Sequence, residues 1–510
     1  MTSSRIIFIG LDAMEASLLL GWGDASYLPA IQYLRRAGAT ANTIPLVGLG
    51  NDATWGSVNT GLAPGRVGRY FVRQVRPGTY RAVKLRDRDI IGTPFWNTVS
   101  RAGKRVAVVD MPYAPIVPDV NGIQLADWLV HGPLYDHKLQ TAPASLAREI
   151  FKRYGKDPVG RSDRPGRRSL SQLIELRDGL LRKVEMKSNL VCDLLSEERW
   201  DLFCVTFTAA HCAGHQLWHI HDPQHPEYDS SIARSIGDPM KDVYMAIDSA
   251  IGRILEHVTE DTTIILFTGP GMGPHYSPSY LLDDILRRLE DGPSAPAVTF
   301  MTRVKAMYRS GVPSGVRKGL RTLADSIDEA SISGDRSQRK CFSLPSNEIS
   351  GAIRVNLVGR EPQGRVQRGA EFDRLFDSLA NDLMELVNID TGNPIVRDVV
   401  RTDRLYQGEH LDELPDILVL WNEAEPIGGV KSPKIGEIRR PYPGNRTGDH
   451  KEDSILIAKG PGIPPGNLLN PISPMDIAPT VAALLGVNMR DIDGKPIHDF
   501  NELPGESVQT

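Results

Sequence analysis

The sequence has few cysteines, no long apolar run and little excess charge of either sign. Its four cysteines are too few and too scattered for a disulfide framework, so a reducing compartment fits them best. No stretch approaches the roughly eighteen uninterrupted apolar residues that a membrane-spanning helix needs. The apolar run near the amino terminus, residues 6–9, is too short for the core of a signal peptide. We therefore expect a cytoplasmic protein without a membrane partner.

The charge balance excludes further classes of partner. The formal net charge is −4, from 59 basic and 63 acidic residues, so bulk electrostatics gives no argument for binding nucleic acid. The hydrophobic share of 41% and the charged share of 24% are ordinary for a globular protein. A small, anionic molecule is the partner we expect, and self-association into a homo-oligomer stays open.

The sequence does contain an alternation of short apolar runs and helical patterns. Runs that end in Gly or Asp are typical of buried parallel strands, and they cover residues 6–9, 106–109, 202–207 and 263–267, with similar runs at 417–420 and 455–458. Helical patterns cover residues 28–37, 95–102, 171–195, 243–258, 370–386 and 475–485. We predict one α/β domain over residues 1–510, with a mainly parallel central sheet, helices on both faces and cap insertions. Its working site should lie at the carboxyl ends of the strands.

Two segments interrupt this alternation and are predicted to be insertions. Residues 145–190 are rich in Arg and Lys, and residues 286–350 carry further cations among Gly, Pro and Ser. The simpler interpretation is solvated loops and helices. The alternative is a cap whose cations attract an anionic substrate.

Histidines are concentrated in one short stretch. Five of the 12 histidines lie within residues 211–225. His211 and His215 are four residues apart, so on a helix their imidazoles share a face and can bind one ion. His219 lies four residues beyond His215, so spacing alone leaves that second pairing open. Imidazole suits Zn and neighbouring transition metals. His450, in a polar loop, is a weaker candidate.

Several motifs, taken together in their order, extend over nearly the whole chain. They are Gly10-Leu11-Asp12, Thr60-Gly61 with Pro64-Gly65, Pro94-Phe95-Trp96, the segment 351–362 and Asp476-Ile477-Ala478-Pro479-Thr480. In this order they resemble the type I phosphodiesterase/nucleotide pyrophosphatase branch of the alkaline phosphatase superfamily. The resemblance implies an alkaline phosphatase-like fold and an enzyme that binds two metal ions.

The resemblance also implies that one of the two metal sites is lost. Members hold that ion with the first-strand Asp, a Thr or Ser nucleophile and an Asp-His pair. At the matching positions this chain keeps Asp12 but has Asn51 in place of the nucleophile and Gly269 and Pro270 in place of the pair. One carboxylate cannot hold a divalent ion against water. We expect no metal at this second site.

The first metal site is altered instead of lost. Members use an Asp, a His four residues later and a late His, and the matching residues here are His211, His215 and His450. A neutral set of three histidines still binds a metal and leaves one position open. We predict a mononuclear site for one divalent transition metal, with Zn as the expected ion and Fe, Cu and Mn not excluded.

These changes narrow the chemistry that we expect. An amide is a poor nucleophile, so Asn51 closes the covalent route of the family. The leading hypothesis is a metal-dependent hydrolase or transferase for a phosphoryl, sulfuryl or related ester-like group. Either a metal-activated water attacks, or the group passes to a metal-held acceptor. Asn51 would donate a hydrogen bond to developing negative charge, and Asp12 would act as a general base or hold a cationic group.

Three further residues are candidates for binding an anionic substrate. Asn356 and Arg360 either contact the substrate or brace a strand, and His275 either returns an imidazole to the lost site or is an ordinary loop histidine. Two other functions stay open. One is a non-catalytic ligand-binding or partner protein of the same fold. The other is a metal-dependent lyase or redox enzyme, because three imidazoles suit Fe or Cu as well as Zn.

Overall fold

The computed structural model describes residues 5–132, 134–135, 138–160, 162–163, 166–293, 334–468 and 470–500. These residues form two compact units. The core unit comprises Met1–Tyr70, Leu85–His275 and Gly444–Thr510, and the inserted unit comprises Phe71–Lys84 and Tyr276–Pro443. Lys305, Arg309, Arg317, Lys318 and Arg321, the cations that we expected in a cap, lie outside the described residues. The cap and the single domain over residues 1–510 therefore stay predictions.

A nine-stranded sheet forms the centre of the core unit within its described residues. In order across the sheet, the strands are β20 (Gly466–Asn467), β2 (Ala39–Asn42), β19 (Ile455–Lys459), β9 (Thr262–Phe267), β1 (Arg5–Leu11), β8 (Leu202–Phe207), β5 (Val106–Val109), β6 (Gly122–Ala126) and β7 (Gln140–Ala142). The run from β9 through β1, β8 and β5 to β6 is parallel throughout. The predicted mainly parallel sheet is confirmed.

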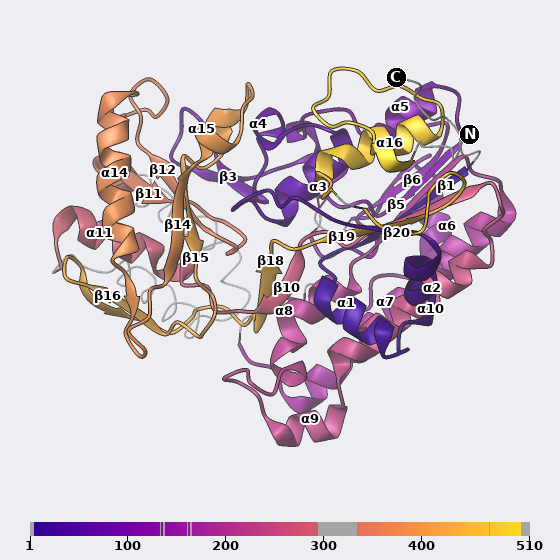
Figure 1. Ribbon diagram of the computed structural model, residues 1–510, viewed down its shortest axis with the longest axis horizontal. Coiled ribbons are helices and arrows are strands. Elements are labelled where there is room, and N and C mark those ends of the chain that lie inside the picture. The colour runs from indigo at the N-terminus through magenta and orange to yellow at the C-terminus, as the bar shows by residue number, and fades with distance from the viewer. Residues whose placement is uncertain are drawn as a thin grey trace, which may run out of the picture. The chain divides into compact units, whose positions relative to one another are not determined.

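Helices cover both faces of this sheet because its central strands are apolar on both sides. Along β1, Ile7, Ile9 and Leu11 enter one buried cluster, while Ile6 and Phe8 enter the other. The first cluster includes residues of α1 (Ala16–Asp24), α2 (Pro29–Ala37), α7 (Leu170–Glu197), α8 (Ala209–His221) and α10 (Pro239–Leu255). The second includes residues of α3 (Asn51–Thr60), α5 (Phe95–Arg101) and α16 (Ile477–Leu484) (Figure 1). Helices on both faces, as predicted, are confirmed.

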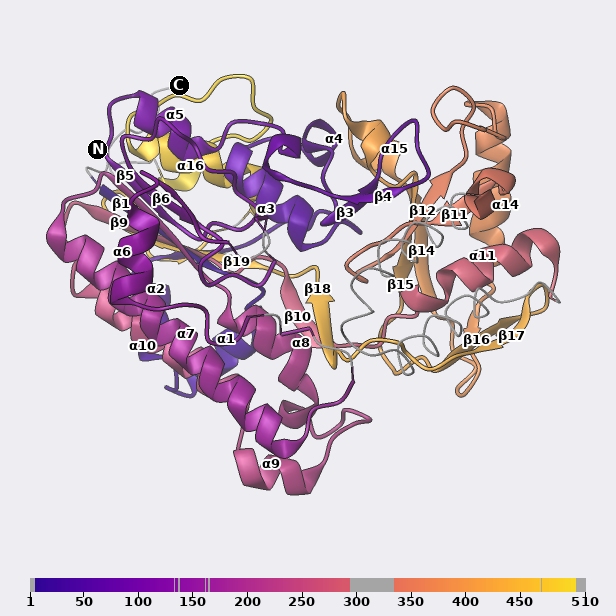
Figure 2. The same cartoon turned by 180° about the vertical axis from the view of Figure 1, so that it is seen from behind.

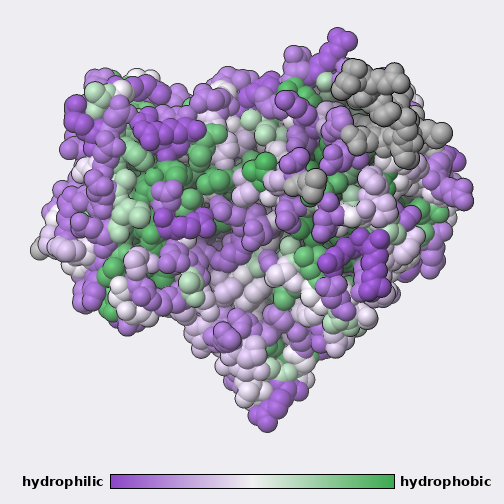
Figure 3. Space-filling model, viewed as in Figure 1, coloured by the Kyte–Doolittle hydropathy of each residue, from purple (hydrophilic) through white to green (hydrophobic). Residues whose placement is uncertain are grey.

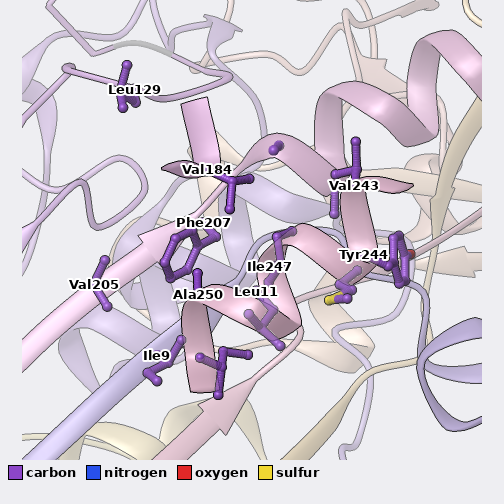
Figure 4. Packing of buried hydrophobic residues seen from close by; sticks show 14 of the residues in the cluster. Ile9, Leu11, Leu129, Val184, Val205, Phe207, Val243, Tyr244, Ile247 and Ala250 are labelled. Atoms are coloured by element: carbon purple, nitrogen blue, oxygen red, sulfur yellow. The ribbon is translucent and has the colours of Figure 1, made fainter. Parts of the chain in front are cut away.

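Figure 4 shows the first of these clusters from close by. Ile9 of β1 and Val205 and Phe207 of β8 lie on the same side of the sheet as Ile247 and Ala250 of α10. Shorter elements complete the core unit: α4 (Pro64–Val67), α6 (Leu146–Arg153), α9 (Ser230–Ile236), β10 (Gly271–Pro274), β18 (Gly448–Lys451) and the 3₁₀ turns η1 (Asp87–Asp89), η4 (Pro474–Asp476) and η5 (His498–Phe500).

The carboxyl ends of β1 and β8 bring distant residues together. Leu11 pairs with Phe207 in register, and the backbone N–H of Asp12 donates to the carbonyl of Phe207 at 3.0 Å. Helix α8 starts two residues beyond β8. Beside it, β10 and β18 pair antiparallel, with Met272 opposite His450 (Figure 2). This edge therefore collects Asp12, the histidines of α8 and His450.

The inserted unit is built around a smaller antiparallel sheet. Its strands, in order, are β11 (Cys341–Ser343), β12 (Gly351–Val355), β15 (Ile417–Trp421) and β14 (Val396–Arg401). The unit also contains β3 (Arg73–Val75), β4 (Ala82–Lys84), η2 (Ser279–Leu281), α11 (Leu282–Asp291), α14 (Ala370–Met384), β13 (Val387–Asn388), α15 (Thr402–Leu405), η3 (Leu411–Glu413), β16 (Gly429–Ser432) and β17 (Gly436–Arg439). The apolar runs at 417–420 and 455–458 do form strands, β15 and β19, but both pair antiparallel with their neighbours. Such a run reports burial on both faces and not strand direction, so the prediction of parallel strands was wrong there.

No helix among the described residues is long and apolar enough to cross a membrane. On the face drawn in Figure 3, hydrophilic side chains separate the apolar patches.

Helix α7 carries a lysine that is buried in an ion pair. Lys187 is 2% exposed, and its Nζ lies 2.8 Å from Oδ2 of Asp110, which is fully buried. The same Nζ donates to the carbonyls of Thr206 at 2.6 Å and Leu129 at 3.2 Å. The amide N–H groups of Trp128 and Leu129 donate to Asp110. This network ties the ends of β5 and β8 to the segment that follows β6.

Replacing Lys187 with Met should lower the free energy of unfolding by about 3–5 kcal/mol, because the Asp110 carboxylate stays buried without its counter-charge. Urea titration followed by circular dichroism measures this. Arg182→Met, on the exposed side of the same helix, removes only the surface pair with Glu185 and should cost less than about 0.5 kcal/mol. Equal losses in the two variants would contradict a structural role for the buried pair.

Candidate metal centre

Four histidines of the core unit meet beside the carboxyl end of β8. His211 and His215 stand one turn apart on α8, with ring centroids 4.8 Å apart. His450 on β18 meets both rings edge to face, at 4.7 and 5.0 Å. His131, which follows β6, stacks on His211 with a centroid distance of 3.9 Å. Two groups with converging ligand atoms result: His131 with His211 and His215, and His215 with Asp449 and His450.

The hydrogen bonds of the Nδ1 atoms fix how His211 and His215 face each other. Nδ1 of His215 lies 2.9 Å from the carbonyl oxygen of Gly448, which can only accept, so this nitrogen carries the hydrogen. Nδ1 of His211 lies 2.7 Å from Oδ2 of Asp12. An ionised Asp12 accepts the Nδ1–H of His211 in the same way. Both Nε2 lone pairs then point at each other across 3.0 Å.

Two facing lone pairs repel each other unless a shared proton or a cation lies between them. Two nitrogens bound to one tetrahedral Zn are about 3.3 Å apart, given Zn–N bonds of about 2.05 Å. The Nε2 separation of 3.0 Å in this pair is close to that value. Nδ1 of His450 is buried and has no hydrogen-bond partner among the described residues. The donor set therefore fits a transition-metal ion.

The alternative pair of His215 with His219 does not form. Nδ1 of His219 lies 3.1 Å from the hydroxyl of Thr447, and His219 belongs to neither group of converging ligand atoms in the described part of the chain.

Asp12 contacts three N–H donors and is 2% exposed. Oδ1 accepts from Nδ2 of Asn51 at 3.0 Å and from Nε1 of Trp55 at 2.9 Å, while Oδ2 meets His211. Burial raises the pKa of Asp12, and the hydrogen bond from Asn51 opposes that effect. These contacts make Asp12 a carboxylate that orients His211. Its expected part as a general base or as a group that holds a cation stays a prediction.

Gly269 and Asp12, which we expected at a lost second site, are separated by an aromatic side chain. Gly269 has a φ of +62°, and a Cβ there would lie 3.4 Å from Nε1 of Trp55. The indole of Trp55 thus lies between Gly269 and the carboxylate of Asp12. Nε2 of His275 lies 3.7 Å from Oδ2 of Asp449, and its expected part in substrate binding stays a prediction.

Asn51 is the first residue of α3 and is 1% exposed. Nδ2 of Asn51 donates one of its two hydrogens to Oδ1 of Asp12. Oδ1 is buried and has no partner among the described groups, so Asn51 also has an unused acceptor, and its expected part as a donor stays a prediction. The first backbone N–H groups of a helix have no partner within the helix and favour an anion. Asn51 therefore combines a free acceptor with a helix start that attracts negative charge.

With this geometry in view, comparison with known families is decisive. Residues 6–424 match the family model described as type I phosphodiesterase / nucleotide pyrophosphatase. The chain belongs to this family. The resemblance of the motifs is thereby confirmed, although His450 lies beyond the matched residues.

Solved structures share the fold of this family member at low sequence identity. Phosphonoacetate hydrolase from Sinorhizobium meliloti 1021, in complex with phosphonoformate, is 14% identical with a TM-score of 0.54, over 95% of this chain and 96% of that one. Murine ectonucleotide pyrophosphatase / phosphodiesterase 5 is 12% identical with a TM-score of 0.49, over 96% and 97%. No curated protein sequence matches the chain. The alkaline phosphatase-like fold that we predicted is confirmed.

Family and fold together support a hydrolase of the alkaline phosphatase superfamily. Members of the family bind divalent metal ions, and the two groups around His215 are residues of this chain that can hold one.

Sequence reasoning missed His131 and Asp449. Asp449 immediately precedes His450, so the polar loop already contained it. His131 comes five residues after the end of β6, and a lone histidine beyond an apolar strand is a weak signal. Its approach to His211 depends on the segment held by Lys187 and Asp110, which no spacing in the sequence predicts.

The substrate-binding residues that we expected at 356 and 360 lie in the inserted unit and have other partners. The side chain of Asn356 accepts from the hydroxyl of Tyr80 at 2.9 Å and donates to the carbonyl of Arg339 at 2.9 Å. Arg360 is held by both carboxylate oxygens of Asp416, at 2.7 Å each. Because both side chains are buried in these contacts, they are not carried into the function proposed below.

Burial lowers the pKa of the imidazoles in this family member's histidine group. For His211 it lowers the pKa to about 3, and the charge of Arg446 adds to the effect. The pKa values of His131, His215 and His450 also fall well below 6.5, chiefly through burial. The neutral form, which binds metals, is therefore the stable one in the folded protein.

In chelator-treated protein, the free energy of unfolding should fall as the pH drops from 6.5 toward 3. The pKa of His211 is about 3 in the folded protein, against an ordinary value of 6.5, so in this window the unfolded chain binds more protons and acid favours it. Each such group adds at most about 1.4 kcal/mol per pH unit. Denaturant titrations at several pH values measure the slope. His211→Asn should flatten this slope, and an unchanged slope in that variant would count against the assignment.

Proposed function

We propose that this chain is a metal-dependent hydrolase or transferase for a phosphoryl, sulfuryl or related anionic ester, with one divalent transition metal held by His211, His215 and His450. The supporting observation is the pair of Nε2 atoms at 3.0 Å, each on a ring whose Nδ1 is held by an acceptor. Zn is the ion we expect, since three imidazoles with an open position suit it well. When bound, such an ion supplies Lewis acidity and lowers the pKa of coordinated water.

The residues around the histidines each take a defined part in this proposal. Asp12 holds His211 in the orientation that turns Nε2 toward His215. Trp55 donates to the same carboxylate and lies beside Gly269, which supports a site with a single ion. The start of α3 attracts the negative oxygens of the transferred group.

Asn51 replaces a nucleophile with a positioning group. It has no hydroxyl, so an external acceptor must attack the transferred group directly. Oδ1 of Asn51, which is buried and has no partner among the described groups, would accept a hydrogen bond from the O–H of that acceptor. Water as the acceptor gives a hydrolase, and an alcohol or another hydroxyl compound gives a transferase.

Metal analysis of protein purified without added metal should find about one equivalent of a divalent transition metal. His215→Ala should lose it, because His215 belongs to both groups of converging ligand atoms. His219→Gln is the matched control on the same helix and should retain it. The loaded protein should then be assayed with aryl phosphate and sulfate esters.

Three results would contradict this proposal in different ways. Two equivalents of metal would restore a second site, and no metal together with inertness toward esters would favour a binding protein. A redox-active ion without ester cleavage would favour the lyase or redox alternative.

Asp12→Asn should weaken metal binding by about 10–100-fold, because it removes the negative charge that orients and polarises His211. Competition with a chelating dye measures the dissociation constant. Asp238→Asn is the control, since Asp238 contacts Nδ1 of His221 at the same short range, 2.8 Å, away from the four histidines. Equal affinity in Asp12→Asn and wild type would exclude the orienting role.

A further inference from the structure

We propose that Arg446 binds the anionic group of the substrate beside the histidines, and that Asp163 occupies its guanidinium while no substrate is bound. This inference rests on the proposed function and names a residue that recognises its substrate class.

The need for such a residue follows from charge. The positions that would hold a second ion are Gly269 and Pro270, so one source of positive charge is lost. The imidazoles of the site are neutral, and Asp12 is acidic. A phosphoryl or sulfuryl ester brings negative oxygens that need donors and positive charge. A nearby cation from the chain itself can supply both.

Arg446 is placed to supply this positive charge and these hydrogen-bond donors. It lies four residues before His450, and its charge helps to lower the pKa of His211, His215, His450 and His131. Its Nη1 lies 3.6 Å from Oδ1 of Asp449, the buried neighbour of His450. Its side chain is 22% exposed, so one end of the guanidinium is anchored near the histidines while solvent can still reach the group.

Asp163 already presents an anion to this arginine. Its Oδ2 lies 2.8 Å from Nη2 of Arg446 and 3.9 Å from Nε2 of His131, whose ring stacks on His211. Its Oδ1 accepts from Nε2 of Gln216 on α8 at 2.8 Å. The carboxylate thus lies between the guanidinium of Arg446 and the ring of His131, at the edge of the histidine group, where an anionic oxygen of the substrate would also be favoured.

A substrate anion can compete with Asp163 for Arg446, because the side chain of Asp163 is 38% exposed and solvent reaches the pair. A guanidinium binds phosphate or sulfate through two parallel hydrogen bonds, which a single carboxylate oxygen does not match.

Other cationic side chains near the histidines are less suited than Arg446 to bind the anionic group of the substrate. Lys183 is 2% exposed, and its Nζ is held by Asp157 at 3.2 Å. Arg168 donates to the side chain of Gln216 and to the carbonyl of Ser162. Arg167 is 75% exposed and pairs with Glu227. Arg167 therefore provides a matched control for the removal of one positive charge.

Inorganic phosphate is the probe, and calorimetric titration of both chelator-treated and zinc-loaded protein is the measurement. Arg446→Gln should weaken phosphate binding by about tenfold or more, since it removes charged hydrogen bonds. Asp163→Asn should strengthen it by about threefold or more, because the competing carboxylate is gone. Arg167→Gln should leave it unchanged. The metal content of all three variants should equal that of the wild type.

Arg446→Gln and Asp163→Asn should change the affinity for phosphate in opposite directions, and a loss of folding cannot produce that result. If Arg446→Gln does not fold, Asp163→Asn decides alone: stronger binding supports the proposal and unchanged binding overturns it. Equal weakening by Arg446→Gln and Arg167→Gln also overturns it, because only net charge would then matter. A wild type without metal whose phosphate binding still depends on Arg446 would refute the proposed function and leave this inference standing.

Discussion

The hydrogen bond between Asp12 and His211 is the contact on which the rest of the site depends. It is buried and 2.7 Å long, and it decides which nitrogen of His211 faces His215. The same carboxylate accepts hydrogen bonds from Asn51 and Trp55. Both of its oxygens are therefore bonded to other side chains of the protein. Through this one group, Asn51 and Trp55 are linked to the orientation of His211.

A buried ion pair holds the segment after β6, which carries His131, in place beside the other histidines. The buried pair of Lys187 and Asp110 fixes the segment after β6 through the backbone of Leu129. That segment brings His131 onto the face of His211. The histidine group therefore lies where two strand ends, one helix and this segment meet, and the ion pair of Arg446 with Asp163 lies at its edge.

The sequence predicted the parts that depend on local pattern. The apolar runs at 106–109 and 202–207 coincide with β5 and β8, because a strand buried on both faces must be apolar throughout. The four-residue spacing of His211 and His215 likewise placed both rings on one side of α8. What the sequence could not predict depends on tertiary contacts: the direction of β15, the stacking of His131 and the partners of Asn356. A polar residue in an apolar context gives no sign of whether it will meet a substrate or a backbone carbonyl.

We propose that one ion binds between His211, His215 and His450, while Asp12 contacts His211 and not the ion. Anomalous diffraction from crystals grown with zinc can locate this ion. We expect one peak within bonding distance of Nε2 of His211 and of His215 and near the ring of His450, with Asp12 still bound to Nδ1 of His211. A peak coordinated by Asp12, a second peak beside Gly269, or no peak at the histidines would contradict it.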